Sequence, residues 1–378
     1  MMKPYDVIVI GVGGMGSATV YQLAKRGKRV LGLERFDVPH DQGSSHGVNR
    51  IIRLAYYEDP AYVPPLKRAY ELWRELEWET GEQILYITGS IDAGPEQDEV
   101  FQGSFRSCLE HNIPHEVLDH NDLAERFPGY RLPEGHYALF QAEGGFLLSE
   151  RCIVDHVLVA QAHGAEVRAR ERVLDWQATT AGVTVRTERG SYQAGSLVIT
   201  AGPWASSLIP GLGDNAQAER QVLGWFQPHR PEIFAPERFP VFNLKVDEGR
   251  YYGFPVYGIP GFKIGLYHHL EEVVDPDRID RSVHAADEAV LRACVGRYFP
   301  EADGPAMTLK TCMFTNCPDE HFIIGTHPDY PQVSFAAGFS GHGFKFCSVV
   351  GEMMADLAVS GTTSHALELF SPRRYLVG

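Results

Sequence analysis

The stretch that decides the fold is Val7-Ile8-Val9-Ile10-Gly11-Val12-Gly13-Gly14-Met15-Gly16. Its four apolar residues have the length and β-branched content of a strand buried on both faces. Apolar residues at helical spacing follow and end at Gly27, a residue typical of helix C-termini. A second apolar run, residues 30–33, ends at Glu34. This order of strand, glycine turn, helix, strand and acid predicts a dinucleotide-binding βαβ unit.

Each residue type in this unit has a physical task. Gly11 permits a tight turn, Gly13 lets the backbone approach a pyrophosphate, and Gly16 lets the helix pack closely on the strand. The helix N-terminus supplies free N–H groups and a partial positive charge to the phosphates. Glu34 is placed to accept hydrogen bonds from ribose hydroxyls and would repel a 2′-phosphate. The unit therefore favours FAD or NAD over NADP.

Composition limits the classes of partner. A chain of 378 residues is long enough for two domains, and its net charge of −15 argues against nucleic acid or an anionic membrane as the main partner. The six cysteines are scattered, without zinc-type spacing, which is typical of a reducing compartment, and we predict no metal site. The chain has no membrane-length apolar run, no signal-peptide pattern and no peroxisomal address. We therefore expect a cytoplasmic protein.

The rest of the chain predicts two domains. Helices are expected at residues 64–81, 99–111 and 150–163, strands at 84–91 and 136–141, and a hairpin-like pair at 166–176 and 182–187. Buried strands ending in glycine return at 197–202 and 333–338, whereas 215–315 holds short aromatic strands broken by proline and glycine. The predicted class is α/β with an α+β second domain. A discontinuous Rossmann-like FAD-binding domain (1–83, 147–214 and 322–378) encloses an inserted substrate domain on a mixed or antiparallel sheet (84–146 and 215–321).

A second strand–glycine–helix junction is Gly338-Phe339-Ser340-Gly341-His342-Gly343-Phe344-Lys345. The helix that follows would direct its positive N-terminus toward whatever lies at this turn. Beside a flavin ring, that potential would favour the negative charge gained on reduction. The alternative is an ordinary tight turn with a solvated lysine.

Basic residues and one cysteine are further candidates. In an extended chain Arg50 and Arg53 point to opposite sides, whereas one helical turn would put them on one face, and either could clamp a carboxylate. Both could also be surface residues. Lys263 lies in an apolar strand, facing either water or a pocket, where its charge could assist oxygen reduction. Cys312, taken alone, is most simply a small buried hydrophobe.

Together these stretches resemble the monomeric sarcosine oxidase family, which has N-methyltryptophan oxidase as a relative. The resemblance runs from Tyr5 to about Phe370. Its most specific pieces are Gly47-Val48-Asn49-Arg50-Ile51-Ile52-Arg53, Cys312-Met313-Phe314-Thr315 with Asp319-Glu320-His321-Phe322-Ile323-Ile324, and the run from Ala336 to Phe346.

The resemblance implies a role for several residues. Cys312 matches the cysteine that carries FAD through an 8α-thioether. Arg53 and Lys345 match the pair that binds the substrate carboxylate. Lys263 matches the lysine that activates oxygen on the opposite flavin face, with Arg50 over that face and His46 beside it. Tyr252 matches a pocket tyrosine.

Motifs and resemblance together give the complete set of predicted site residues. The catalytic residues are Lys263, Arg50, His46, Tyr252 and Tyr267, and the substrate-binding residues are Arg53, Lys345, Tyr252 and Phe314. The residues expected against FAD are Gly11, Gly13, Gly14, Met15, Gly16, Glu34, Arg35, Ser44, Ser45, Arg50, Ile51, Val173, Ala201, Gly202, Trp204, Cys312, Met313, Phe339, Gly341, His342, Gly343, Phe344 and Lys345.

The chain departs from the family pattern at two positions. Phe314 stands where sarcosine-specific members have tyrosine, so one hydroxyl is missing. Tyr267 stands where they have histidine, and His268 and His269 follow it. The loss of a phenol favours bulkier or more apolar N-substituents.

The resemblance implies a monomeric flavoprotein oxidase of small secondary amino acids such as sarcosine or other N-alkyl glycines. Hydride passes to FAD N5, oxygen is reduced to hydrogen peroxide, and the imine hydrolyses, so that sarcosine gives glycine and formaldehyde. One alternative is an N-methyltryptophan oxidase or an oxidase of cyclic imino acids such as pipecolate or proline. Others are an NAD-linked dehydrogenase, and an FAD-binding protein or dehydrogenase that does not use oxygen.

Overall fold

The computed structural model describes residues 5–376, and its first sheet holds the dinucleotide-type unit. Strand β1 pairs in parallel with β2 and β12, β12 with β19, and β2 with β9, while β10–β11 and β18–β19 are antiparallel hairpins. The strands are β1 (Tyr5–Ile10), β2 (Val30–Leu33), β9 (Glu166–Arg168), β10 (Val173–Thr179), β11 (Gly182–Thr187), β12 (Ser191–Ile199), β18 (Ile323–His327) and β19 (Tyr330–Ala337). Segments far apart in sequence therefore build one sheet, which confirms the discontinuous α/β prediction.

Four helices pack over this part: α1 (Gly14–Lys25), α2 (Val63–Thr80), α5 (Ser149–Ala162) and α8 (Cys347–Ser360). Helices α1 and α8 pack closely at Gly351, where a Cβ would lie 2.6 Å from the carbonyl carbon of Ala18. The absence of a side chain at Gly351 therefore allows the two helices to pack against each other beside the parallel strands.

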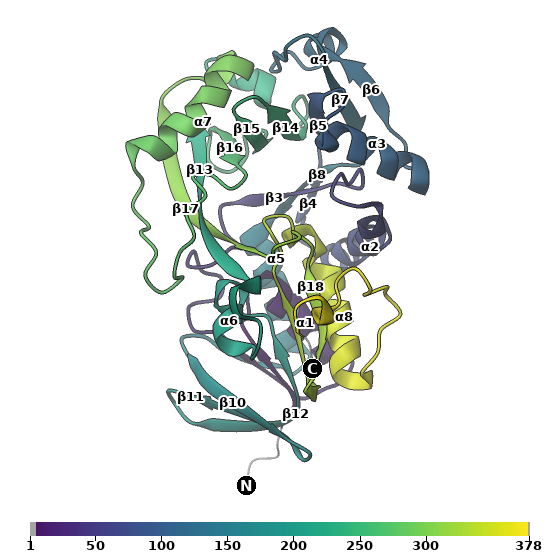
Figure 1. Ribbon diagram of the computed structural model, residues 1–378, viewed down its shortest axis with the longest axis vertical. Coiled ribbons are helices and arrows are strands. Elements are labelled where there is room, and N and C mark those ends of the chain that lie inside the picture. Colours follow the sequence, from purple (N-terminus) through teal and green to yellow (C-terminus); the bar gives the residue numbers. More distant parts are fainter. Residues whose placement is uncertain (1–4, 377–378) are drawn as a thin grey trace.

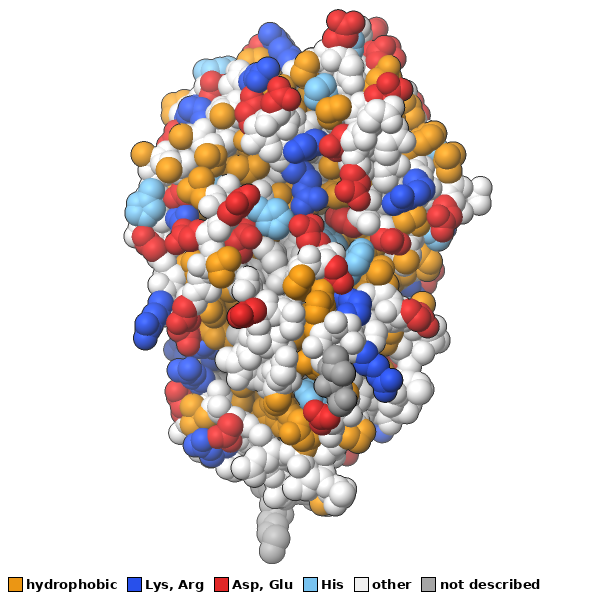
Figure 2. Space-filling view, in the orientation of Figure 1, with side chains coloured by type: hydrophobic (Ala, Val, Ile, Leu, Met, Phe, Trp, Pro, Cys, Tyr) orange, Lys and Arg blue, Asp and Glu red, His pale blue; other side chains and the backbone are white. Residues whose placement is uncertain are grey.

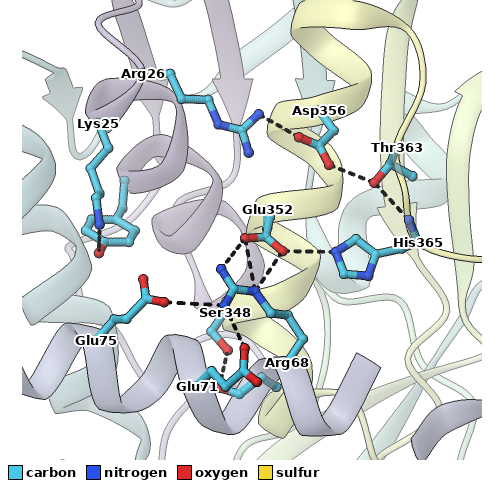
Figure 3. A network of polar contacts seen from close by, with 12 residues as sticks. Lys25, Arg26, Arg68, Glu71, Glu75, Ser348, Glu352, Asp356, Thr363 and His365 are labelled. Carbon is cyan, nitrogen blue, oxygen red and sulfur yellow. Dashed lines mark hydrogen bonds and ion pairs between the residues drawn. The ribbon is translucent and has the colours of Figure 1, made fainter. Parts of the chain in front are cut away.

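Polar contacts tie the C-terminal helix to its neighbours (Figure 3). Arg68 on α2 contacts Glu352 on α8 at 2.9 Å, and His365 contacts the same carboxylate at 2.9 Å. Arg26, just after α1, contacts Asp356 at 2.7 Å. Such partly exposed pairs contribute about 0–1 kcal/mol each. Their structural consequence is to fix α8, whose N-terminal end lies at the candidate site.

The second sheet has the order β17-β13-β16-β15-β14-β5-β7-β6 and is antiparallel except for the β14–β5 pair. Its core is rich in phenylalanine, with Phe226, Phe242, Phe262 and Phe299 all buried. Its strands are β5 (Ser90–Pro95), β6 (Glu116–Asp119), β7 (His136–Gln141), β13 (Gln217–Phe226), β14 (Val241–Val246), β15 (Gly249–Phe254), β16 (Phe262–Leu266) and β17 (Ala306–Asn316). The sheet is therefore mixed, as predicted.

The remaining elements complete the arrangement. The second sheet carries α3 (Glu99–His111), α4 (His120–Arg126) and α7 (Ala285–Tyr298), and the first part carries the short α6 (Ala205–Leu208). A small third sheet has the order β3-β8-β4, with β3 (Asn49–Ile52), β8 (Gly145–Leu148) and β4 (Leu85–Ile87). The two large sheets occupy opposite ends of an elongated molecule (Figure 1).

Two predicted segments differ in detail. The expected strand at 84–91 divides into β4 and β5, which join different sheets; between them Gly89 adopts φ +79°. The expected hairpin partner at 166–176 divides into β9, which pairs with β2, and β10, which pairs with β11. Arg170, at φ +55°, turns the chain between β9 and β10. Both breaks contain a residue of positive φ, which an apolar pattern does not reveal.

Surface properties bear on partners in two ways. None of the helices in residues 5–376 combines the length and the apolar character that spanning a bilayer demands. On the face shown in Figure 2, acidic and basic side chains are interspersed.

Candidate active site

A cavity of about 1660 Å³, including open space at its mouth, lies at the carboxyl ends of the parallel strands. Ile10 ends β1, Leu33 ends β2, Thr200 follows β12, and Ala336 lies near the end of β19; all four line the cavity. Ligands of open α/β sheets bind at this edge. The fold therefore places the cavity where a nucleotide cofactor is expected.

The first glycine turn has the geometry of a phosphate cradle. Gly11 adopts φ +87°, and a Cβ on Gly16 would lie 1.7 Å from the carbonyl oxygen of Gly11, so neither position tolerates a side chain. Gly13, at the N-cap of α1, has open space where a Cβ would be, and no side chain caps the helix. The free N–H groups of α1 therefore begin at the cavity wall, as anion binding requires.

Glu34 closes the βαβ unit from the end of β2. Its buried carboxylate accepts hydrogen bonds from the backbone N–H groups of Val12, at 2.9 Å, and Phe36, at 3.0 Å. These bonds hold the acid in the cavity wall beside the glycine turn. Space, free N–H groups and a fixed acid together fit a dinucleotide such as FAD.

The structure brings most of the predicted cofactor residues together. Those that line the cavity are Gly11, Gly13, Gly14, Met15, Glu34, Arg35, Ser44, Ser45, Arg50, Val173, Ala201, Gly202, Trp204, Met313, Phe339, Gly341, Gly343 and Phe344. Five predicted residues are not part of the lining, namely Gly16, Ile51, Cys312, His342 and Lys345.

Sequence reasoning missed part of the wall. The missed residues include Ile153, Glu171, Arg172, Leu174, Thr200, Pro203, Ser207, Leu208 and Cys347. A sequence motif could have identified Thr200, because this residue lies in the predicted strand–glycine junction at 197–202. No motif could have identified Leu174 or Leu208, because these residues belong to a hairpin and to a short helix that lack one.

Cys312 lies directly behind the lining. Its Sγ is 3.7 Å from Nη2 of Arg50 and 3.8 Å from the carbonyl oxygen of Ser44, and both residues line the cavity. Burial tends to raise the pKa of the thiol, but His46 and Arg50 lower it to about 7. Burial instead raises the pKa of each of the other five cysteines: Cys108, Cys152, Cys294, Cys317 and Cys347. Of the six cysteines, Cys312 is thus the one whose thiol pKa is lowered, and a lowered pKa increases the thiolate fraction.

Arg50 and Arg53 point in different directions. Arg50 lies in β3, and its guanidinium donates to the carbonyl oxygen of Ser44 at 2.9 Å, on the Cys312 side. Arg53 follows β3 and donates to the carbonyl oxygen of Ala55 at 2.6 Å. Of the two geometries weighed for this segment, the extended one is confirmed.

The guanidinium of Arg53 is already neutralised within the protein. It is 1% exposed and contacts Glu58 at 2.9 Å and Asp92 at 3.4 Å. Burial tends to raise the pKa of Glu58, but Arg53 and other nearby cations lower it to about 2. For Asp92 burial prevails and raises the pKa to about 6. A carboxylate that binds at Arg53 would compete with Glu58 for the guanidinium.

Within residues 5–376, Lys345 makes fewer hydrogen bonds than its ammonium group can donate. Its buried Nζ donates one hydrogen bond, to the carbonyl oxygen of His342 at 2.7 Å, although an ammonium can donate three. Burial, aided by Arg53, lowers the pKa of Lys345 to about 7. The residue precedes α8 directly, in a short 3₁₀ turn from Phe344 to Phe346. A second helix N-terminus thus begins beside the cavity.

Lys263 contrasts with Lys345 because all its donors are used. Its buried Nζ donates to the carbonyl oxygens of Gly47 and Asn49, both at 2.8 Å, and to Oδ1 of Asn49 at 2.7 Å. Burial and the charge of Arg50 lower the pKa of Lys263, whereas three acceptors around one nitrogen match a protonated ammonium. The prediction left open whether this lysine faces water; the structure buries it.

Tyr252, Tyr267 and Phe314 form an aromatic cluster. The ring centroids of Tyr252 and Tyr267 are 5.1 Å apart, and those of Tyr267 and Phe314 are 5.8 Å apart. Phe314 lines the cavity, and a Cβ on Gly341 would lie 2.4 Å from its ring, so the glycine turn before α8 fits against this phenylalanine. The cluster connects the cavity with β15 and β16.

Comparison with known proteins agrees with this geometry. Residues 6–357 match the family model described as FAD dependent oxidoreductase. The chain is 43% identical to "Monomeric sarcosine oxidase" of Streptomyces avermitilis, over 99% of this chain and 98% of that protein. It is 35% identical to "N-methyl-L-tryptophan oxidase" of Salmonella dublin, over 98% and 99%. A solved structure of NikD, "an unusual amino acid oxidase", superposes with a TM-score of 0.86 at 25% identity, covering 98% of each chain.

Proposed function

Because this chain belongs to the family of FAD-dependent oxidoreductases and is related over its whole length to the monomeric sarcosine oxidases, we propose that it oxidises small secondary amino acids with oxygen. Sarcosine and other N-alkyl glycines are the proposed substrates. The observation that carries this proposal is the buried Lys345 beside the cavity, with donors to spare for a carboxylate. FAD held by the glycine turn at Gly11 and Gly13 and by Glu34 would supply the redox chemistry, which is acceptance of a hydride from the carbon beside the amine nitrogen and reduction of oxygen to hydrogen peroxide.

The protein itself supplies binding and orientation. Lys345 hydrogen-bonds the substrate carboxylate. Arg53 also binds this carboxylate when the carboxylate displaces Glu58 from the guanidinium. Fixing the anionic end in this way orients the amine and its neighbouring C–H bonds, and positioning of this kind supplies a large part of enzymatic rate enhancement. The imine product then hydrolyses in water, so that sarcosine gives glycine and formaldehyde.

We also propose that Cys312 tethers FAD covalently through its sulfur. The support is its thiol pKa of about 7 and its position one residue from Met313, which lines the cavity. On the same side, Lys263, Arg50 and His46 are proposed to provide the positive environment in which oxygen is reduced, because preorganised charge stabilises a developing anion.

Three coarser assignments accompany the function. The two large sheets are proposed as the cores of two domains with the bounds predicted above, and their buried clusters are largely separate. We propose a monomer, as the names of the bacterial relatives say of those proteins. A cytoplasmic location is proposed from the sequence features given above.

The test of the proposed function is an amine-dependent peroxide assay. Purified yellow protein is mixed with sarcosine, N-ethylglycine, N-methyltryptophan and pipecolate in air, and peroxide is measured with a coupled peroxidase. Turnover of sarcosine or N-ethylglycine is expected. Reduction of an artificial dye without peroxide would instead indicate a dehydrogenase.

Replacing Phe314 by tyrosine is expected to narrow the tolerance for N-substituents. The added hydroxyl puts a polar group into the aromatic cluster beside the cavity. Differences of one methylene in such a site change kcat/KM by roughly 10- to 200-fold, so we expect the N-ethylglycine to sarcosine ratio to fall about tenfold. The measurement is kcat/KM on a series of N-alkyl glycines. A wild-type protein that prefers sarcosine by a wide margin would contradict the prediction.

Anion affinity is expected to fall as the pH rises through about 7, where Lys345 loses its proton. Below this pH the ammonium is charged and binds a carboxylate; above it the charge-assisted bond is lost, weakening binding by roughly tenfold or more. The measurement is the dissociation constant of methylthioacetate, which lacks an oxidisable amine, from pH 6 to 9. The variant Lys345→Met should bind weakly throughout, and a wild-type profile that is flat would refute the assignment.

A further inference from the structure

Arg250 is a cation near the site whose side chain makes no hydrogen bond to residues 5–376. It lies on β15, two residues before Tyr252, so both side chains leave the same face of the strand. Its guanidinium carbon is 4.1 Å from the centroid of the Tyr267 ring, in the aromatic cluster that borders the cavity. Its side chain is 23% exposed, whereas Arg53 is 1% exposed. Arg250 therefore stands at the outer end of the site and Arg53 at the inner end.

The interactions of Arg250 are unlike those of its neighbours. A guanidinium has five N–H donors, yet within residues 5–376 that of Arg250 makes no side-chain hydrogen bond and has one ion pair, to Glu320 at 3.6 Å. Glu320 is itself held by His268, at 3.2 Å. Arg53, in contrast, has short contacts to Ala55 and Glu58. The guanidinium of Arg250 can therefore donate hydrogen bonds to a bound ligand.

Tyr57 links the inner and outer cations. The guanidinium carbons of Arg53 and Arg250 lie 4.5 and 5.6 Å from the centroid of this one ring. The Tyr57 hydroxyl is buried and interacts with the side chain of Tyr267. The guanidinium carbon of Arg53 is also 4.4 Å from the ring centroid of Tyr56, and Nζ of Lys345 is 5.2 Å from the same centroid. The guanidinium of Arg250 is therefore connected through Tyr57 and Arg53 to the proposed carboxylate site at Lys345.

From this arrangement we infer that Arg250 binds a second anionic group of the substrate, so that the preferred substrates are secondary amino acids with two carboxylates. The first carboxylate binds at the inner end, at Lys345, and the second forms a two-pronged bond with Arg250, the geometry that a guanidinium favours. N-methylaspartate, N-methylglutamate and iminodiacetate belong to this class. The inference rests on the proposed function and names its substrate class.

The test compares two substrates that differ in one charge. N-methyl-L-aspartate and N-methyl-L-asparagine have the same size, so the ratio of their kcat/KM values reports recognition of the second carboxylate. We expect the wild-type ratio to be about 10 to 100, the range of a charge-assisted hydrogen bond. In Arg250→Leu the ratio should fall toward one, and in Glu320→Gln, which removes the competing carboxylate, it should rise.

The matched control is Arg126→Leu. Arg126 also stacks on an aromatic ring, that of Phe140 at 4.3 Å, and also pairs with a glutamate, Glu116 at 2.7 Å, but at the β6 edge of the second sheet. The ratio of kcat/KM for N-methyl-L-aspartate to that for N-methyl-L-asparagine should be the same in Arg126→Leu as in the wild type. A wild-type ratio near one, or a ratio that survives in Arg250→Leu, would overturn the inference. An equal loss for both substrates in Arg250→Leu would also overturn it, because Arg250 would then bind the first carboxylate.

Binding without turnover gives a second readout. Calorimetric titration of the yellow holoprotein with thiodiacetate and methylthioacetate compares a dicarboxylate with a monocarboxylate, neither of which has an amine. Thiodiacetate should bind at least tenfold more tightly to the wild type and lose that advantage in Arg250→Leu. If no secondary amine is oxidised, the proposed function fails; if N-methyl amino acids are oxidised but aspartate and asparagine derivatives react equally, this inference alone fails.

Discussion

Replacing Cys312 by serine is expected to release the yellow colour from the protein on acid precipitation. In the wild type the colour should stay in the pellet, because the proposed thioether survives denaturation. Serine cannot form that bond, and its hydroxyl is not a thiolate of pKa about 7 as Cys312 is. The expected change is from colour bound entirely in the pellet to colour free entirely in the supernatant.

The control for this experiment is Cys347→Ser. Cys347 lines the cavity directly, yet burial holds the pKa of its thiol above the usual range, so the thiol stays neutral and unreactive. Its variant should keep the colour in the pellet. Wild-type protein that releases all its colour into the acid supernatant would exclude the covalent link, and a serine variant that retains colour would assign the link to another residue.

Replacing Lys263 by methionine is expected to slow oxygen consumption by about 10²- to 10³-fold, the usual cost of removing one preorganised charge from an active site. Reduction by the amine in the absence of air should change far less, because Lys263 lies on the Arg50 side and makes no contact with Lys345. Stopped-flow absorbance measures the two half-reactions separately. Equal slowing of both would count against the assignment.

A matched lysine controls for the loss of charge and of packing. Lys310 and Lys263 lie near the same ring, with Nζ atoms 6.0 and 5.5 Å from the centroid of Trp225, but Lys310 is exposed on β17. Lys310→Met should leave both half-reactions near the wild-type rates. Lys263→Met also removes the donor of Oδ1 of Asn49, whereas the carbonyl oxygens of Gly47 and Asn49 still accept from the N–H of Asn49 and from Nη1 of Arg50. One unpaired buried group costs about 1–3 kcal/mol of folding free energy. A lower unfolding temperature is therefore expected and does not alter the kinetic comparison.

The first sheet could be predicted because its signals are local. The glycines, the apolar strands and Glu34 lie within thirty-odd residues, and each is required by the turn, the close packing or the acid position. The two later strand–glycine junctions repeat the same local chemistry. The resemblance to a family then placed Cys312, Lys263 and Lys345, although their separation in sequence gives no reason to bring them together.

The electrostatic state of the site could not be predicted in the same way. Asp92 reaches Arg53 from β5 of the second sheet, and only the folded topology brings the two within 3.4 Å. Glu58 offered a weak signal, because it lies five residues after Arg53 in the same segment. No sequence pattern indicated a role for Arg250, because an arginine at the start of a strand is ordinarily solvated. The structure alone shows that its side chain makes no hydrogen bond to residues 5–376.

The choice between the two geometries of Arg50 and Arg53 also depended on distant residues. The sequence allows either a strand or one helical turn at this point. Pairing of β3 with β8, about 95 residues later, fixes the extended form. Arg53, which is proposed to bind the carboxylate, and Arg50, which is proposed to face the site of oxygen reduction, are thereby directed to opposite sides.

Anaerobic mixing of the yellow holoprotein with amines tests the central claim most directly. Sarcosine, N-methyl-L-aspartate, N-methyltryptophan and pipecolate are each added without oxygen, and the visible flavin band is followed. Bleaching by sarcosine or N-methylaspartate, with recovery of the colour and formation of peroxide when air is admitted, is the result we predict. A band that no secondary amino acid bleaches would contradict the account.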